Sequence, residues 1–125
     1  RALRVEPDAH DAAVALISQL PLVVACALVE AAARAPDWPL ARTLAAQGWR
    51  DTTRLAGGDP VLGAGMLALN AAHVAAGRRR HRGVLEAWQV RLDALAAPGA
   101  PSADVDALLA ELERVSAAAR GDDGS

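Results

Sequence analysis

The sequence contains neither phenylalanine nor tyrosine, and its three tryptophans are the only large aromatic side chains. Hydrophobic residues still make up 53% of the 125 residues, so a core must be built mainly from leucine, valine and alanine. Alanine has the highest helix propensity of all residues. Because no convincing strand pattern follows residue 5, the sequence predicts an all-α fold, and its length fits one domain.

Lysine is also absent, so all 13 positive charges are arginine, and 15 acidic residues give a net charge of -2. General nucleic-acid binders are usually basic, so no nucleic-acid partner is predicted. The single cysteine, Cys26, cannot form an internal disulfide and favours a reducing, cytoplasmic location. The first residue is Arg1 instead of Met, so we expect the chain to be part of a longer protein.

Two kinds of site are missing from the sequence. The three histidines, His10, His73 and His81, lack the mutual spacing and carboxylate neighbours of a metal site, so no metal is predicted. No glycine-rich loop follows a strand, so the chain should not bind a dinucleotide pyrophosphate. His10 beside Asp11 fits either an oriented general base or a capping residue near a helix start.

Local signals divide the chain into three parts. Residues 1–7 contain a short alternating run, Ala2–Val5, which we interpret as a remnant strand of an upstream dinucleotide-binding domain. Residues 8–120 form the helical domain, with Asp8 as the expected N-cap of its first helix and Ser102 as that of its last. Residues 121–125 are a tail.

Residues 12–35 are apolar nearly all the way round, which predicts a helix buried on every side. A membrane span is the alternative by length, but Ser18, Gln19 and Pro21 interrupt the run, so no membrane is predicted. Pro21 lacks a backbone donor and should bend the helix between Gln19 and Leu22. A small domain cannot cover such a helix completely, so we expect a second subunit to do so.

A second apolar stripe lies on residues 84–95, where Leu85, Trp88, Leu92 and Leu95 recur at helical spacing. With residues 12–35 it predicts the interface of a homodimer. Just before the stripe stands Arg78-Arg79-Arg80-His81-Arg82. This run fits a phosphate or nucleic-acid patch by charge alone. On a helix, however, consecutive residues surround the axis, so a solvated face is favoured.

Glycine and proline mark two helix boundaries in the middle of the chain. Gly48 is expected to end a helix over residues 40–47 in a left-handed conformation. Asp59 with Pro60 should start a helix that continues as far as Val74. Asn70 lies within that apolar pattern and is expected to bond a backbone group instead of a ligand.

Between these boundaries the sequence reads Trp-Arg-Asp-Thr-Thr-Arg, over residues 49–54. If residues 50–54 form one helical turn, Arg50 and Arg54 share a face, and Asp51 can pair with Arg54. Guanidinium groups bind carboxylates through two parallel hydrogen bonds, so the pattern indicates a clamp for a small organic acid. The same spacing also fits an ordinary surface ion pair.

Three blocks follow one another in this chain. They are His10-Asp11 with Ser18-Gln19-Leu20-Pro21-Leu22 on the next helix, then residues 44–56 (LAAQGWRDTTRLA), then Asp59-Pro60 with Asn70 downstream. Over roughly residues 5–97 they resemble the C-terminal helical domain of the prephenate dehydrogenase family. The middle block is the specific one, because a helix stop, an aromatic residue and Arg-Asp-x-x-Arg rarely coincide.

The resemblance implies a dimerisation and substrate domain of the 6-phosphogluconate-dehydrogenase C-terminal-like type. The whole enzyme would oxidatively decarboxylate prephenate to 4-hydroxyphenylpyruvate in tyrosine biosynthesis. Its NAD or NADP would be bound mainly by a domain absent from this chain, so the fragment alone should be inactive. By resemblance Arg54 holds a substrate carboxylate, Asp51 orients it, Arg50 adds a second charge, and Gln19 bonds substrate or cofactor.

Three positions depart from the family pattern. Gln19 and Leu22 stand where the family usually has histidine, and Gly63 stands where it has tryptophan. Arogenate as the substrate, and a catalytically degenerate paralogue, therefore stay open beside prephenate. A different class also stays open, namely a stand-alone helical dimerisation module in which the Arg/Asp turn is only surface.

Overall fold

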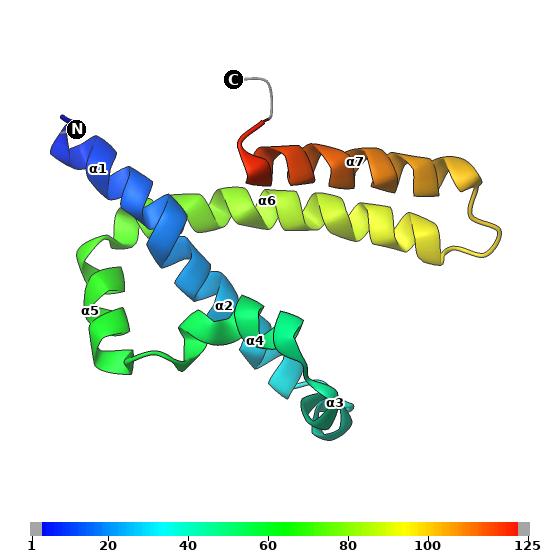
Figure 1. Ribbon diagram of the computed structural model, residues 1–125, viewed down its shortest axis with the longest axis horizontal. Helices are drawn as coiled ribbons and strands as arrows, with labels where there is room; N and C mark the ends of the chain where they lie inside the picture. The colour runs from blue at the N-terminus through cyan, green and yellow to red at the C-terminus, as the bar shows by residue number, and fades with distance from the viewer. Residues whose placement is uncertain (1–3, 123–125) are drawn as a thin grey trace. The chain divides into compact units, whose positions relative to one another are not determined.

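The computed structural model describes residues 4–122, which are all-α as predicted. The helices are α1 (Pro7–Val14), η1 (Ala15–Gln19), α2 (Leu20–Ala33), α3 (Trp38–Leu44), α4 (Gln47–Thr53), η2 (Arg54–Gly57), α5 (Pro60–Leu69), α6 (Ala71–Ala96) and α7 (Ser102–Arg120), where η1 is a π-helix and η2 a 3₁₀-helix (Figure 1). Two compact units divide the chain at residues 80 and 81, within α6, and each is described by itself.

The N-terminal strand is not found among the described residues. Arg4, Val5 and Glu6 have no regular structure, and residues 1–3 lie outside the described range. Helix α1 begins at Pro7, whose fixed φ suits the first helical position. Asp8 therefore lies in the first turn, where the helix dipole favours its charge, and the prediction of Asp8 as N-cap was wrong.

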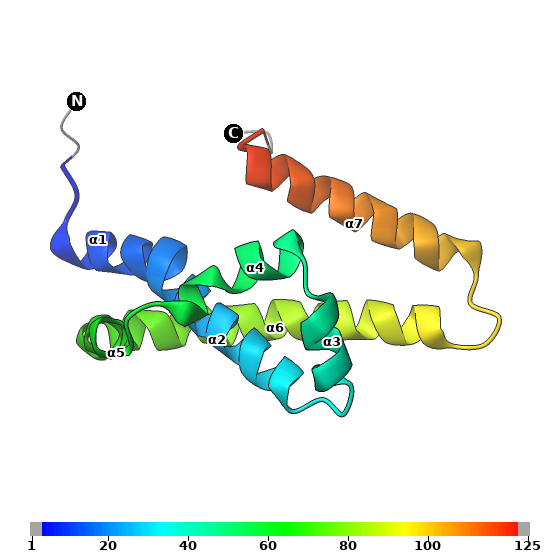
Figure 2. The same cartoon turned by 60° about the horizontal axis from the view of Figure 1, so that its bottom comes forward.

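Helices α1 and α2 follow one another end to end, joined by the π-helical turn η1 (Figures 1 and 2). At the end of that turn the Leu20 N–H donates to the carbonyl of Ala15, five residues earlier. Pro21 comes next and has no N–H with which to continue the α-helical ladder. Directly before Pro21, where the sequence predicted a bend, the structure thus has a π-turn.

In the single chain α1 is largely exposed and α2 is only partly buried, so the prediction of burial on every side was wrong for the chain alone. Among the described residues the buried hydrophobic side chains are only Ala15, Leu20, Ala25 and Val74, and Ile17 is 75% exposed. The run Pro7–Ala33 is long and apolar enough to cross a membrane, and 22% of its most apolar window is buried. Length and hydropathy are shared by spans and core helices.

Helices α3 and α4 are joined at Ala45 and Ala46 without a glycine. Ala45 leaves the helical region with ψ 132°, and α4 starts at Gln47, so Gly48 lies in the first turn of a new helix. The prediction of Gly48 as a left-handed stop was therefore wrong. The Trp38 and Trp49 rings pack against each other across the junction in a tilted arrangement, with centroids 5.7 Å apart and ring planes at 53°.

Helix α5 starts as predicted, because the Asp59 carboxylate accepts from the Val61 N–H at 3.0 Å with Pro60 in the first turn. The predicted continuation to Val74 was wrong, since the chain bends by 92° at Asn70 between α5 and α6. Beyond the bend Gly77 is buried, and the side chain of Leu20 packs closely against it.

The second unit is a hairpin of the later part of α6 and α7 (Figure 2). Glu111 on α7 joins the two helices by ion pairs: it pairs with Arg114 on its own helix and with Arg91 on α6 at 3.6 Å. Arg91 also lies over the Trp88 ring, 4.9 Å from its centroid. The hydrogen bond from Arg114 holds the pKa of Glu111 below its ordinary value, and the charges of Arg114 and Arg91 act in the same direction.

The C-terminal boundary agrees in part with the sequence. Helix α7 ends at Arg120, and Gly121 follows with φ 77°, a left-handed conformation that suits glycine. Pro101 occupies the N-cap position in place of Ser102, which is the first helical residue. Of the predicted tail, residues 123–125 lie outside the described range.

Candidate functional site

The predicted acid clamp lies where α4 passes into η2. Within residues 4–122 no ion pair joins Asp51 to Arg54, because the Asp51 carboxylate accepts instead from the Gln47 amide at 2.7 Å. Arg50 donates to the backbone carbonyl of Ala45 at 3.4 Å. Arg50, Asp51 and Arg54 are all exposed in the single chain.

The helix changes type at this point because of two threonines. Thr52 and Thr53 donate their hydroxyls to the carbonyls of Gly48 and Trp49, four residues earlier, at 2.8 and 2.7 Å. Such bonds compete with the helical ladder and disturb it. Thr53 has φ -104° and ψ 0°, and the 3₁₀ turn starts at Arg54. The single α-helical turn assumed for residues 50–54 is therefore interrupted, and a direct Asp51–Arg54 pair does not form.

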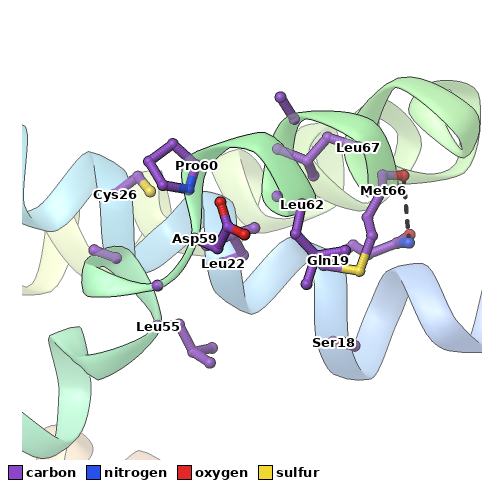
Figure 3. Close-up of a pocket in the computed structure, with 14 residues that line it drawn as sticks. Ser18, Gln19, Leu22, Cys26, Leu55, Asp59, Pro60, Leu62, Met66 and Leu67 are labelled. Atoms are coloured by element: carbon purple, nitrogen blue, oxygen red, sulfur yellow. Dashed lines mark hydrogen bonds between the residues drawn. The ribbon is translucent and has the colours of Figure 1, made fainter.

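A pocket of about 460 Å³ lies between the start of α2, η2 and α5 (Figure 3). Its lining is Ser18, Gln19, Leu22, Cys26, Leu55, Ala56, Gly58, Asp59, Pro60, Leu62, Gly63, Ala64, Met66 and Leu67. In this view Gln19 and Met66 stand at one end, with Cys26 and Pro60 at the other. The walls are mostly apolar with a few polar groups, as is usual for a small-molecule site.

Of the four predicted substrate residues, the structure brings only Gln19 into the pocket lining. Arg54 stands directly before Leu55, which does line the pocket, whereas Arg50 and Asp51 lie one turn earlier on α4. The lining residues Leu55 and Ala56 belong to η2, so this short helix carries both Arg54 and one wall of the pocket. A substrate role for Arg54, Asp51 and Arg50 stays a prediction.

Gln19 is 7% exposed and is the buried polar residue of the described chain. Its amide nitrogen donates to the Met66 carbonyl at 3.4 Å, and its oxygen accepts from Asn70 at 2.7 Å. Asn70 also donates to the Asp11 carbonyl at 2.8 Å, so it bonds a backbone group as predicted. A hydrogen-bonded link between η1 and the bend after α5 thus holds the Gln19 end of the pocket wall.

Two features of this region were not predicted. Asp59 both caps α5 and lines the pocket, which the cap signal alone did not indicate. His73 on α6 lies 3.0 Å from the Asp8 carboxylate on α1, while the neighbouring His10 and Asp11 meet only at 3.4 Å on an exposed surface. A separation of 65 residues between Asp8 and His73 leaves no local signal in the sequence.

No group of three or more metal-ligating side chains occurs in the described range. The described residues also form no strand–glycine loop–helix unit. What the pocket can do chemically is enclose an apolar ring or chain and offer it hydrogen bonds from Gln19 and Ser18 at one end.

The described residues thus form a helical domain with an apolar pocket beside a π-turn. Residues 6–112 match the family described as "Prephenate dehydrogenase, dimerization domain". This match covers most of the chain, so the chain belongs to the prephenate dehydrogenase dimerization-domain family.

Two solved structures are similar over nearly the whole chain. Arogenate dehydrogenase from Synechocystis is 32% identical with a TM-score of 0.77, covering 98% of this chain and 41% of that one. A putative prephenate dehydrogenase from Corynebacterium glutamicum is 28% identical with a TM-score of 0.62, covering 91% of this chain and 34% of that one. No curated protein matches the sequence. The chain thus spans less than half the length of the dehydrogenases it resembles.

Proposed function

We propose that this chain is the dimerisation and substrate domain of an NAD(P)-dependent dehydrogenase that oxidatively decarboxylates prephenate or arogenate. The observation that carries the proposal is the family match over residues 6–112. The two similar structures, an arogenate dehydrogenase and a putative prephenate dehydrogenase, support the same reaction class. NAD or NADP is bound mainly by a further domain, and the chain alone is inactive.

In this proposal the substrate enters the pocket between α2, η2 and α5. Its ring packs against apolar walls such as Leu22 and Leu62, and Gln19 donates a hydrogen bond to one of its oxygens. Arg54, at the start of the same short helix that supplies Leu55, holds a substrate carboxylate. Asp51 orients Arg54, and Arg50 adds a second positive charge beside the substrate carboxylate. A guanidinium suits this task because it binds a carboxylate through two hydrogen bonds.

The domain works as a homodimer through residues 12–35 and 84–95, in the cytoplasm. Support comes from the dimerization-domain family and from apolar side chains that the single chain leaves exposed, including Ile17 and Leu92. Neither a membrane nor a nucleic acid is part of the proposal. The arginine run 78–82 lies on helix α6, where Arg82 pairs with Glu86, as on a solvated helix face.

The proposal is tested by assaying the full-length protein for reduced nicotinamide formation, first with prephenate and then with arogenate, and with NAD and NADP in turn. Turnover of either substrate is expected, and the ratio of the two kcat/KM values names the substrate. A folded protein that turns over neither substrate, with either cofactor, supports the stand-alone helical dimerisation module instead. The exposure of Arg50 and Arg54 in the single chain is the observation that favours this second candidate.

A further inference from the structure

The orientation of the Gln19 amide is fixed by two backbone carbonyls. A carbonyl only accepts hydrogen bonds, so the Asn70 atom 2.8 Å from the Asp11 carbonyl must be its amide nitrogen. That nitrogen also donates to Gln19 at 2.7 Å, which makes the facing Gln19 atom its oxygen. The Gln19 nitrogen is then left facing the Met66 carbonyl, at 3.4 Å.

The Met66 carbonyl needs a donor for a reason that lies in the fold. It is one of the last four carbonyls of α5, which have no partner within an α-helix. The bend at Asn70 prevents the chain from supplying one by continuing the helix. Both bonds of the Gln19 amide therefore favour the same orientation, with the oxygen toward Asn70 and the nitrogen toward α5. Figure 3 shows the second of these bonds, between Gln19 and Met66.

An amide nitrogen carries two hydrogens, and Gln19 uses one of them for Met66. Within residues 4–122 no second acceptor bonds this nitrogen, and Gln19 lines the pocket. The pocket wall therefore holds a buried donor in a fixed orientation. The rest of the lining is largely apolar and includes Leu22, Leu62 and Leu67. A donor in such surroundings favours a ligand that places an oxygen acceptor there.

We propose that Asn70 is a positioning residue that keeps the Gln19 amide nitrogen available to the pocket, so that Gln19 donates to a carboxylate, carbonyl or hydroxyl oxygen of the bound molecule. This rests on the proposed function, in which the pocket receives the substrate. Asn70 has no contact with the ligand. Its effect comes from setting which end of Gln19 the ligand meets.

The kinetic test replaces Asn70→Asp in the full-length protein. The new carboxylate can only accept, so it attracts the Gln19 nitrogen and turns the Gln19 oxygen toward the substrate. KM is expected to rise on the order of 10- to 100-fold, the effect of a lost hydrogen bond to a charged group, while kcat changes much less. Asn70→Ala, which removes both donors without adding charge, should raise KM by a smaller factor.

Ala103→Asp is the control, because it adds the same single negative charge at an exposed site in the first turn of α7, outside the pocket and outside residues 12–35 and 84–95. It should leave KM unchanged. A KM for Asn70→Asp equal to that of Ala103→Asp overturns the proposal. So does a fall in kcat and in folded protein for both Asn70 variants with no change in KM, because that pattern shows a purely structural role.

A second test needs neither activity nor a variant. The chain has only four side-chain amides, those of Gln19, Gln47, Gln89 and Asn70, so its ¹⁵N-labelled form gives four NH₂ signals. The Asn70 pair and one Gln19 proton should exchange slowly with water, whereas the exposed Gln47 and Gln89 pairs exchange fast. Gln19 exchange as fast as that of Gln47 overturns the fixed orientation. If the exchange rates show the Asn70–Gln19–Met66 hydrogen bonds but the full-length protein turns over neither substrate, the proposed function alone fails.

Discussion

At the scale of single residues, the side chain that the structure places best for binding is an amide and not a charge. Gln19 is buried at the end of the pocket, whereas Arg50, Asp51 and Arg54 are exposed in the single chain. The sequence indicated Gln19 through its place beside Pro21. It did not show that Asn70, 51 residues away, would hold it, because that contact depends on the bend after α5.

Arg54→Ala in the full-length protein should raise KM strongly and leave cofactor binding unchanged. The substrate carboxylate loses its guanidinium partner in this variant, and a hydrogen bond to a charged group is typically worth about 1.5 to 3 kcal/mol. Steady-state kinetics with a separate cofactor titration measures both effects. Arg42→Ala, which removes another exposed arginine, from α3, is the control. Equal KM values for the two variants would remove Arg54 from the site.

At the scale of helices, the sequence predicted those features that depend on one or two neighbouring residues. Asp59 with Pro60 starts α5, and Pro21 marks the place of the helix distortion. The sequence did not predict helix ends that no glycine, proline or capping residue marks. The break between α3 and α4 falls at Ala45 and Ala46, although alanine is a good helix former. The bend at Asn70 interrupts a continuous apolar pattern. Tertiary packing decides such points, and a single sequence does not show it.

Glu111 should make the stability of the hairpin depend on pH. Its pKa is lowered from the ordinary value of 4.5, chiefly by the hydrogen bond from Arg114. A folded-state pKa below the unfolded value means that the carboxylate stabilises the fold above the unfolded pKa, and that this contribution is lost as the pH falls through the folded pKa. Stability should therefore decline as the pH is lowered below about 4.5, the ordinary value for this group.

Thermal melts from neutral pH downward check this effect. Glu111→Gln should remove part of the decline, since glutamine does not titrate. Glu113→Gln changes an exposed acid on the same helix and is the control. Identical pH profiles for wild type and Glu111→Gln would show that the Glu111 ion pairs make no pH-dependent contribution to stability.

At the scale of the whole molecule, the main fact is how little of the apolar surface one chain covers. Within the described residues, large hydrophobic side chains remain exposed on both units, among them Ile17 and Leu69 in the first and Val90 in the second. Burial of apolar area is the dominant favourable term in association. The sequence predicted a partner for residues 12–35 from the same shortage of cover, and the family is a dimerization domain.

The protein should be a dimer at micromolar concentration, and Ile17→Glu should shift it toward the monomer. Ile17 is 75% exposed and lies within the predicted interface, where a second subunit would bury the new charge at high cost. Leu69→Glu is the control, because Leu69 is 92% exposed but lies outside residues 12–35 and 84–95. Light scattering measures the mass. A monomer for the wild type would contradict the interface.

The central claim is that the pocket between α2, η2 and α5 receives the substrate, and α5 offers a pair of glycines that tests it. Gly63 lines the pocket, and a Cβ there would stand 3.4 Å from the Leu22 side chain. Gly65, on the same helix, is not in the lining and has open space beside it. Replacing either glycine by leucine adds the same side chain to the same helix, but only one replacement fills the pocket.

The most direct measurement is therefore the KM for prephenate or arogenate in full-length Gly63→Leu and Gly65→Leu. The account predicts a rise on the order of tenfold or more for Gly63→Leu, the size expected when an extra side chain costs 1 to 3 kcal/mol of fit. It predicts a KM close to that of the wild type for Gly65→Leu. Equal KM values in the two variants would show that the substrate binds elsewhere.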